Sequence, residues 1–86
     1  MEIRYSERAE KQLDDMDKEL RGMFLKHGEK LKRMPPRRHL RFGMPFEVED
    51  VMRQARMVYH IESNVLYVFR CFKGHKEYEK WYKSYK

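Results

Sequence analysis

The stretch that decides the fold runs from residue 56 to residue 78 and reads RMVYHI (56–61), ESN (62–64), VLYVFRCF (65–72) and KGHKEY (73–78). The first and third segments are rich in β-branched and aromatic residues, and the Ser and Asn between them suit turn backbones. The stretch therefore predicts a β-hairpin. The second strand leads directly into a basic cluster. Cations gathered at the end of a hairpin bind phosphate well, because they donate charged hydrogen bonds to its oxygens.

The pairing of the two strands determines where these cations lie. If Glu62 pairs with Val65 across the turn, Arg56 lies opposite Cys71. Arg56 and Lys73 are then diagonal neighbours on one face of the sheet. Two cations at that separation repel each other unless an anion lies between them, which favours a phosphate site.

The same spacing allows a second interpretation, in which Arg56 forms a surface ion pair with Glu47 or Glu49 on a neighbouring strand. A one-residue slip in the turn would also separate the basic side chains. The sequence alone leaves the phosphate site and the surface ion pair open.

The spacing of apolar residues predicts the other elements. Ser6 is suited to cap a first helix, Asp17 can cap a second, and Pro35 with Pro36 ends it. The expected class is α+β: an N-terminal strand and a helical hairpin packed on one face of a three- to four-stranded antiparallel sheet, with a short C-terminal helix. The expected order is a strand at 1–5, helices at 7–16 and 17–34, alternating stretches at 37–42 and 46–52, strands at 56–61 and 65–72, and a helix at 75–85.

Length and charge limit the organisation and the partners. With 86 residues the chain is expected to form one domain, residues 1–86, and its 14% aromatic content argues against disorder despite 40% charged residues. The net charge of +6 favours a polyanionic partner, either nucleic acid or an acidic protein segment. A basic domain with no such partner is the alternative.

Several site classes find no support in the sequence. Cys71 is the single cysteine, so no intrachain disulfide is expected, a reducing cytoplasm is favoured, and a small buried hydrophobe is a better interpretation than a nucleophile. The four histidines show no paired metal-ligand spacing, and no Gly-rich phosphate loop is present. No metal and no cofactor are expected, and no apolar run is long enough to cross a bilayer.

A second basic run lies upstream of the hairpin. It can grip the phosphates of an RNA backbone, which needs charge but little fine geometry, or it can protect a strand edge from aggregation. Its members are Arg37, Arg38 and Arg41.

The end of the hairpin carries a titratable and aromatic group. His75 titrates near neutral pH and can move a proton at a phosphodiester, although a lone histidine is more often a surface or capping residue. Tyr78 and Tyr82 can stack on bases, whereas Trp81 fits the packing face of a terminal helix better.

Three segments of this sequence resemble RelE-type toxins of toxin–antitoxin pairs. They are YSERAEKQL (5–13), similar to the start of the family's first helix, ARMVYHI (55–61), similar to its arginine-bearing strand, and KGHKEY (73–78), similar to its basic ending before a tyrosine. The size and the order of elements agree as well. The resemblance covers nearly the whole chain.

The resemblance implies ribosome-dependent cleavage of mRNA, in which a 2′-hydroxyl attacks the adjacent phosphorus without a metal. By position, Arg56 would stabilise the phosphate, Lys73 or His75 would act as acid or base, and Tyr78 would orient the mRNA base or the nucleophile. The implied partners are a cognate antitoxin, the ribosome and mRNA, in the cytoplasm, with no membrane. Lys76 joins the upstream arginines as an RNA-binding residue.

The sequence departs from the family where a more basic stretch is usual. Glu47, Glu49 and Asp50 stand there instead, which weakens the nuclease interpretation unless one carboxylate is the general base. Two alternatives stay open. One is a toxin of the related ParE branch, which shares the fold and acts on DNA gyrase, and the other is a non-catalytic basic RNA-binding module.

Overall fold

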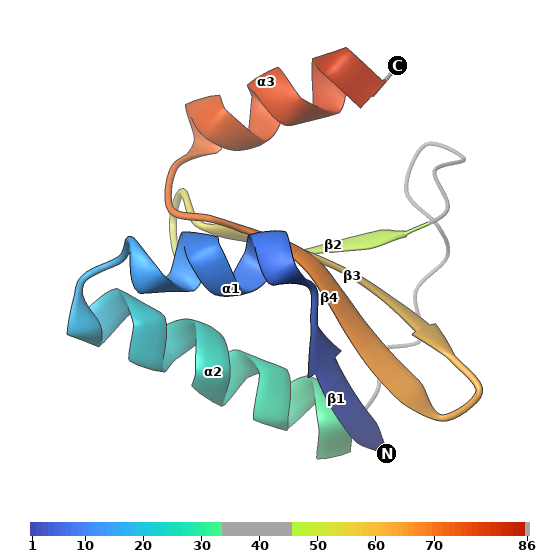
Figure 1. Ribbon diagram of the computed structural model, residues 1–86. Helices are drawn as coiled ribbons and strands as arrows, with labels where there is room; N and C mark the ends of the chain where they lie inside the picture. Colours follow the sequence, from blue (N-terminus) through green and yellow to red (C-terminus); the bar gives the residue numbers. More distant parts are fainter. Residues whose placement is uncertain (34–45, 86) are drawn as a thin grey trace.

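A computed structural model describes residues 1–33 and 46–85 of the chain (Figure 1). The predictions for the alternating stretch at 37–42 and for the end of the second helix after residue 33 lie outside the described residues. The elements are β1 (Glu2–Tyr5), α1 (Glu7–Asp14), α2 (Lys18–Arg33), β2 (Glu47–Asp50), β3 (Arg56–Glu62), β4 (Val65–Phe72) and α3 (His75–Tyr85). The predicted α+β class and the order of these elements are confirmed.

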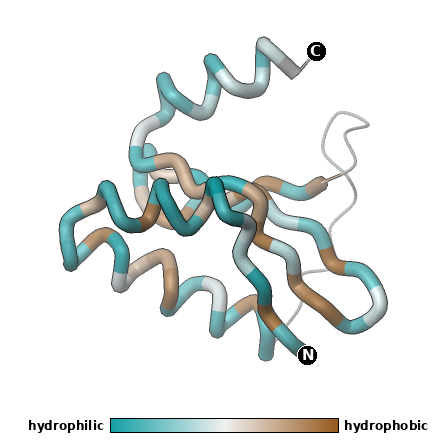
Figure 2. Tube along the Cα trace, viewed as in Figure 1, coloured by the Kyte–Doolittle hydropathy of each residue, from teal (hydrophilic) through white to brown (hydrophobic). Residues whose placement is uncertain are grey.

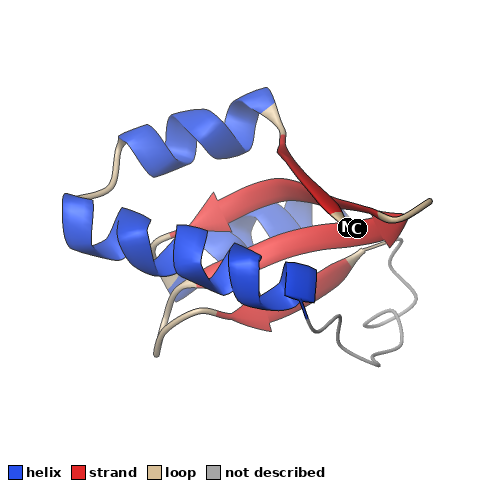
Figure 3. Ribbon diagram, turned by 90° about the horizontal axis from the view of Figure 1, so that it is seen from below, coloured by secondary structure: helices blue, strands red, loops and turns tan. Residues whose placement is uncertain are grey.

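The four strands form one sheet in the order β1-β4-β3-β2. The β2–β3 and β3–β4 pairs are antiparallel as expected, but β1 runs parallel to β4, so the sheet is mixed. The helices lie on both faces of the sheet. The α1–α2 hairpin covers one face and α3 lies over the other (Figures 1 and 3).

The second covered face follows from the strand pattern. Alternate residues of the central strands are apolar on both sides, and each side has its own core. Figure 2 shows hydrophobic stretches along the strands and in patches on α1 and α2. Beneath the helical hairpin the fully buried side chains include Phe24, Met57, Tyr59, Leu66 and Val68. Beneath α3 the buried residues are Phe46, Val48, Val58, Phe72 and Tyr78.

Helix α1 is fixed to β4 at the point where β1 ends. The Ser6 hydroxyl accepts a hydrogen bond from Ala9 N at 3.0 Å, which caps α1 as predicted, and donates one to Phe69 O at 2.7 Å. The side-chain oxygen of Gln12 accepts a hydrogen bond from Cys71 N at 2.8 Å. The side chains of Ser6 and Gln12 thus make hydrogen bonds with backbone groups of β4 that no neighbouring strand reaches.

Helix α2 begins as predicted, because Asp17 Oδ1 accepts a hydrogen bond from Leu20 N at 2.8 Å. None of the described helices is both long and apolar enough to cross a bilayer.

The β3–β4 hairpin has the predicted pairing at its turn and a different pairing at its far end. Glu62 lies opposite Val65, and the two turn residues between them have positive φ angles of 50° and 63°, as tight hairpin turns require. The register then shifts by one residue between Val58 and Tyr59, since Tyr59 pairs with Val68 but Val58 pairs with Arg70. This β-bulge moves every later pair of the hairpin by one position.

Candidate functional site

The bulge decides which residues share a face with Arg56. Arg56 lies opposite Phe72, and the expectation that it lies opposite Cys71 was wrong. Its side chain consequently belongs to the face that α3 covers, where Phe72 packs against Tyr78. Opposite residues of an antiparallel pair point to the same side of the sheet, so a one-residue shift reverses the assignment.

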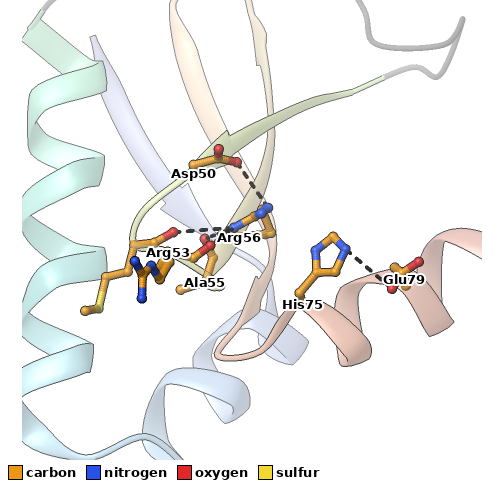
Figure 4. A network of polar contacts seen from close by, with 7 residues as sticks. Asp50, Arg53, Ala55, Arg56, His75 and Glu79 are labelled. Atoms are coloured by element: carbon orange, nitrogen blue, oxygen red, sulfur yellow. Dashed lines mark hydrogen bonds and ion pairs between the residues drawn. The ribbon is translucent and has the colours of Figure 1, made fainter.

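The guanidinium of Arg56 is held by its own turn. Nη1 donates to the backbone oxygens of Met52, Arg53 and Ala55 at 3.4, 3.3 and 3.1 Å. Nε lies 3.1 Å from Asp50 Oδ1 (Figure 4). Among the described residues, Nη2 has no hydrogen-bond partner. The side chain is only 14% exposed, so the group is fixed in orientation and presents one nitrogen for a further acceptor.

Arg56 forms an ion pair with a carboxylate of the neighbouring strand, as one of the two open interpretations has it, but the partner is Asp50 and not Glu47 or Glu49. Strand β2 pairs Asp50 with Arg56, whereas Glu49 lies opposite Met57 and faces the helical hairpin. There Glu49 Oε2 accepts a hydrogen bond from the Tyr59 hydroxyl at 3.3 Å. The acidic strand therefore places one carboxylate at Arg56, and Asp50 is itself 65% exposed.

Glu47 belongs to the same side of β2 as Glu49, opposite Tyr59. Burial raises the pKa of the Glu47 carboxyl. The positive charge of a protonated His60 lowers this pKa, and the negative charge of Glu49 raises it. Glu47 Oε2 and His60 Nδ1 are buried and make no hydrogen bond to a described residue. Glu47 is thus a partly desolvated carboxyl that lies apart from the Arg56 guanidinium.

Lys73 does not lie beside Arg56, so the predicted diagonal pair of cations was wrong. Lys73 lines a cavity of about 230 Å³ together with Asp15, Cys71 and Glu77 on the side of the sheet that α1 covers. The bulge is again the cause, because Cys71 and Lys73 alternate with Phe72 and point away from Arg56.

His75 begins α3 close to the face of Arg56. Its ring centroid lies 6.0 Å from that of Tyr78, and Tyr78 lies 6.0 Å edge-on from Phe72, the residue opposite Arg56. Figure 4 shows His75 on the side of α3 nearer Arg56, with Nε2 turned to Glu79 Oε1 at 3.4 Å. His75 is exposed, so its imidazole is accessible from solvent.

Tyr78 is a packing residue of this face. It is 7% exposed, and its ring lies within 6.4 Å of those of Phe72, Trp81 and Tyr82. The interpretation of Trp81 as a packing residue is confirmed, since it packs against the same core. This aromatic cluster, made of Phe46, Phe72, Tyr78, Trp81 and Tyr82, fixes α3 and hence the position of His75.

Of the predicted RNA-binding residues, one lies on a described helix and three lie outside the described residues. Lys76 is exposed on α3, one residue after His75. Arg37, Arg38 and Arg41 lie outside the described residues.

Two residues of this face were missed by sequence reasoning. Asp50 was counted in the acidic stretch, but it was not assigned to Arg56, although its alternation with Val48 placed it on the right side. Arg70 lies opposite Val58, two residues before Phe72 on the same face, and its Nη1 donates to Phe69 O at 2.8 Å. Burial lowers the pKa of Arg70, and the positive charge of Arg8 lowers it further. Alternation from Phe72 identifies Arg70 once the bulge is known.

The described residues offer neither a metal-ligand cluster nor a reactive thiol. No three His, Cys, Asp or Glu residues among residues 1–33 and 46–85 lie where they could hold a metal ion. Burial raises the pKa of the Cys71 thiol to about 12, so the group is an unreactive thiol at neutral pH.

Comparison with known proteins shows which known fold the chain has. No protein-family model and no curated protein matches the sequence. Among solved structures, the isolated E. coli RelE toxin superposes with a TM-score of 0.74 at 20% identity, over 99% of this chain and 98% of that chain. The chain has the RelE toxin fold.

Toxin–antitoxin complexes show the same RelE fold. A chain of the intact E. coli RelBE complex gives a TM-score of 0.71 at 20% identity, over 85% of this chain and 95% of that chain. A chain of the Staphylococcus aureus YoeB–YefM complex gives 0.68 at 13% identity, over 84% and 94%. At these identities the likeness concerns the fold, and the chemistry has to be argued from the residues themselves.

Proposed function

We propose that this chain is the toxin of a toxin–antitoxin pair and that it cleaves mRNA on the ribosome. The observation that carries the proposal is the Arg56 guanidinium, which its own turn holds in place and whose Nη2 has no partner among residues 1–33 and 46–85. A fixed guanidinium suits a phosphate, because a group that is already oriented loses little freedom when the anion arrives. The RelE fold shared with toxins and with chains of toxin–antitoxin complexes supports the biological role.

The proposed reaction is a transesterification within the RNA. The 2′-oxygen loses its proton to a base and forms a bond to the adjacent phosphorus, and the bond from phosphorus to the 5′-oxygen breaks. That oxygen takes a proton from an acid, which leaves a 2′,3′-cyclic phosphate and a free 5′-hydroxyl. Arg56 stabilises the two negative charges on the phosphorane, and His75 supplies the acid or the base.

The geometry favours His75 over Lys73 for the proton transfer. His75 lies on the Arg56 side of the molecule, whereas Lys73 lines the cavity under α1. Tyr78 acts through the packing that positions His75, since its ring is buried in the aromatic cluster. Lys76, together with Arg37, Arg38 and Arg41, binds the RNA backbone by charge.

The test is induction of the chain in bacteria, followed by primer extension on mRNA and by growth measurement. Arg56→Ala should abolish growth arrest and lower cleavage by about 100-fold or more, the usual effect of removing one donor to a developing negative charge. Arg4→Ala is the matched control, because Arg4 is an exposed arginine paired with Glu2 on the opposite edge strand. An Arg56→Ala protein that is folded and still cleaves mRNA would falsify the proposal.

The ion pair between Asp50 and Arg56 favours a second candidate function. A carboxylate on the guanidinium competes with phosphate, which suits a RelE-fold toxin that acts on DNA gyrase or a basic RNA-binding module without catalysis. Either alternative predicts that no new 5′ ends appear in mRNA on induction. A DNA supercoiling assay with purified gyrase then separates the two, because only the gyrase poison inhibits supercoiling.

A further inference from the structure

Arg70 is a second half-buried arginine on the face of the sheet that carries Arg56. The β-bulge places Arg56 opposite Phe72 on β4, and Arg70 lies two residues before Phe72. The two arginines are therefore diagonal neighbours, and the backbones of such neighbours lie about 7–8 Å apart. Arg70 thus takes the place beside Arg56 that was predicted for Lys73.

The Arg70 guanidinium is held at the point where β1 ends and α1 begins. Its Nη1 donates to Phe69 O at 2.8 Å, and the Ser6 hydroxyl, which caps α1, donates to the same oxygen at 2.7 Å. Arg8 follows two residues after Ser6, in the first turn of α1, and it is exposed. Arg8 and Arg70 thus lie around one corner of the molecule, and together they are called the arginine pair below.

The charges of the arginine pair are not compensated by any carboxylate among residues 1–33 and 46–85. No ion pair joins Arg8 or Arg70 to a described Asp or Glu, whereas Arg56 has Asp50 at 3.1 Å from its Nε. The pKa of Arg70 is lowered first by burial and then by the positive charge of Arg8, so the two charges repel each other. An anion that binds between the two guanidinium groups removes this repulsion.

We propose that the arginine pair binds a second phosphate of the RNA, next to the phosphate that Arg56 binds. The inference rests on the proposed function, because its ligand is the RNA held at Arg56. Guanidinium groups donate paired hydrogen bonds to phosphate oxygens. Phosphates repeat at every nucleotide, so a strand that crosses from β3 to β4 presents one to Arg56 and another to the pair. A single carboxylate of a protein partner offers no such repeat, which makes RNA the better occupant.

The test measures binding of a short RNA that cannot be cleaved. The RNA carries fluorescein and a 2′-O-methyl group on every ribose, so it has no nucleophile, and fluorescence anisotropy with the full chain gives its Kd. Binding therefore does not depend on catalysis. RNA that binds through the arginine pair, from a chain that cleaves no mRNA, would refute the nuclease proposal and support this one.

Matched variants locate the second phosphate. Arg70→Gln should weaken RNA binding about tenfold, because a charged hydrogen bond to phosphate is lost. Arg8→Gln should weaken it several-fold, since water competes for this exposed group. The variant with both changes should lower the slope of log Kd against log salt by about 0.7, the value for one phosphate of a single strand. Arg4→Gln is the control and should stay within about twofold, because Arg4 is exposed and already paired with Glu2.

Folding of each variant is checked by circular dichroism and thermal unfolding. If Arg70→Gln does not fold, Arg70→Lys takes its place, because lysine keeps the charge and the stem but loses the planar fork. Arg70→Lys should weaken binding several-fold, and the exposed Arg8→Gln tests the pair independently.

Three results would overturn the proposal. The first is a Kd that Arg8→Gln and Arg70→Gln leave unchanged while Arg56→Ala weakens the same RNA. The second is equal weakening by Arg4→Gln, which would show a bulk effect of net charge. The third is a glutamate-rich peptide that displaces the RNA and loses more affinity than the RNA does with Arg70→Gln, which would assign the pair to an acidic protein segment.

Discussion

Replacing Asp50 with Asn should increase the affinity of the chain for RNA. Asp50 Oδ1 lies 3.1 Å from Arg56 Nε, where Coulomb attraction at an effective dielectric of about 20 amounts to about 5 kcal/mol. Asp50 is 65% exposed, however, and pairs with such exposure are worth about 0.2–1 kcal/mol in measurement. Freeing Arg56 from this pair should therefore strengthen phosphate binding by about 1.4- to fivefold.

The orientation of the guanidinium should survive the substitution. Three backbone oxygens still accept from Nη1, and the asparagine side-chain oxygen can still accept from Nε. The gain therefore comes from losing a negative charge next to the phosphate. The gain should also shrink as salt rises, because the screening length falls from about 10 Å at 0.1 M to about 3 Å at 1 M and the Asp50 carboxylate is exposed.

The assay is anisotropy of a short labelled RNA, together with the rate of mRNA cleavage on programmed ribosomes at subsaturating chain. Glu62→Gln is the control for net charge, since it removes the same charge at the turn of the hairpin, far along β3 from Arg56. If Asp50→Asn lowers affinity, Asp50 positions Arg56 instead of competing for it. Equal gains from both variants would show a bulk charge effect, and either result refutes the reasoning.

Three further predictions concern stability and reactivity. Ser6→Ala should lower the free energy of unfolding by about 2 kcal/mol and Tm by about 8–16 °C, because it removes both the cap of α1 and the hydrogen bond to Phe69 O. Ser84→Ala, on the exposed side of α3, is the control and should change Tm by less than about 4 °C in the same thermal unfolding experiment. Cys71, with its pKa near 12, should react with a disulfide reagent at pH 8 only as fast as the chain opens, and labelling that is fast and independent of urea would contradict its burial. Burial raises the pKa of Glu47, so its contribution to stability is present below the ordinary pKa of 4.5 and is lost as pH rises through the higher folded value. Glu47→Gln should flatten that fall in urea unfolding between pH 4 and 7, and an unchanged pH profile would argue that the carboxyl is solvated.

The elements of the fold could be predicted because each has a local cause. The hydroxyl of Ser6 starts α1, the carboxylate of Asp17 starts α2, and a two-residue turn with positive φ at Ser63 and Asn64 joins β3 to β4. Each cause lies within a few residues of its effect. The parallel pairing of β1 with β4 is different, because about sixty residues separate the two strands and no local signal records their direction.

Only some of the residues of the candidate site could be predicted from the sequence. The sequence identified Arg56 and His75, which the structure places on one side of the sheet, and it wrongly added Lys73 to the same face. The error has a single origin. The β-bulge after Val68 adds one residue to β4, and with a side-chain period of two it sends Lys73 and Arg56 to opposite faces.

The turn from Val51 to Ala55 holds the Arg56 guanidinium in place. The Val51 amide closes this turn by donating to Ala55 O at 3.0 Å, and the backbone oxygen of Met52 accepts a hydrogen bond from Arg56. The bonds from Nη1 to Met52 O and Arg53 O, at 3.4 and 3.3 Å, are long for hydrogen bonds and weaken steeply with small displacements. A change that displaces Met52 O or Arg53 O therefore acts directly on the orientation of the guanidinium. With Lys73 on the other face, the backbone oxygens of its own turn orient the Arg56 guanidinium.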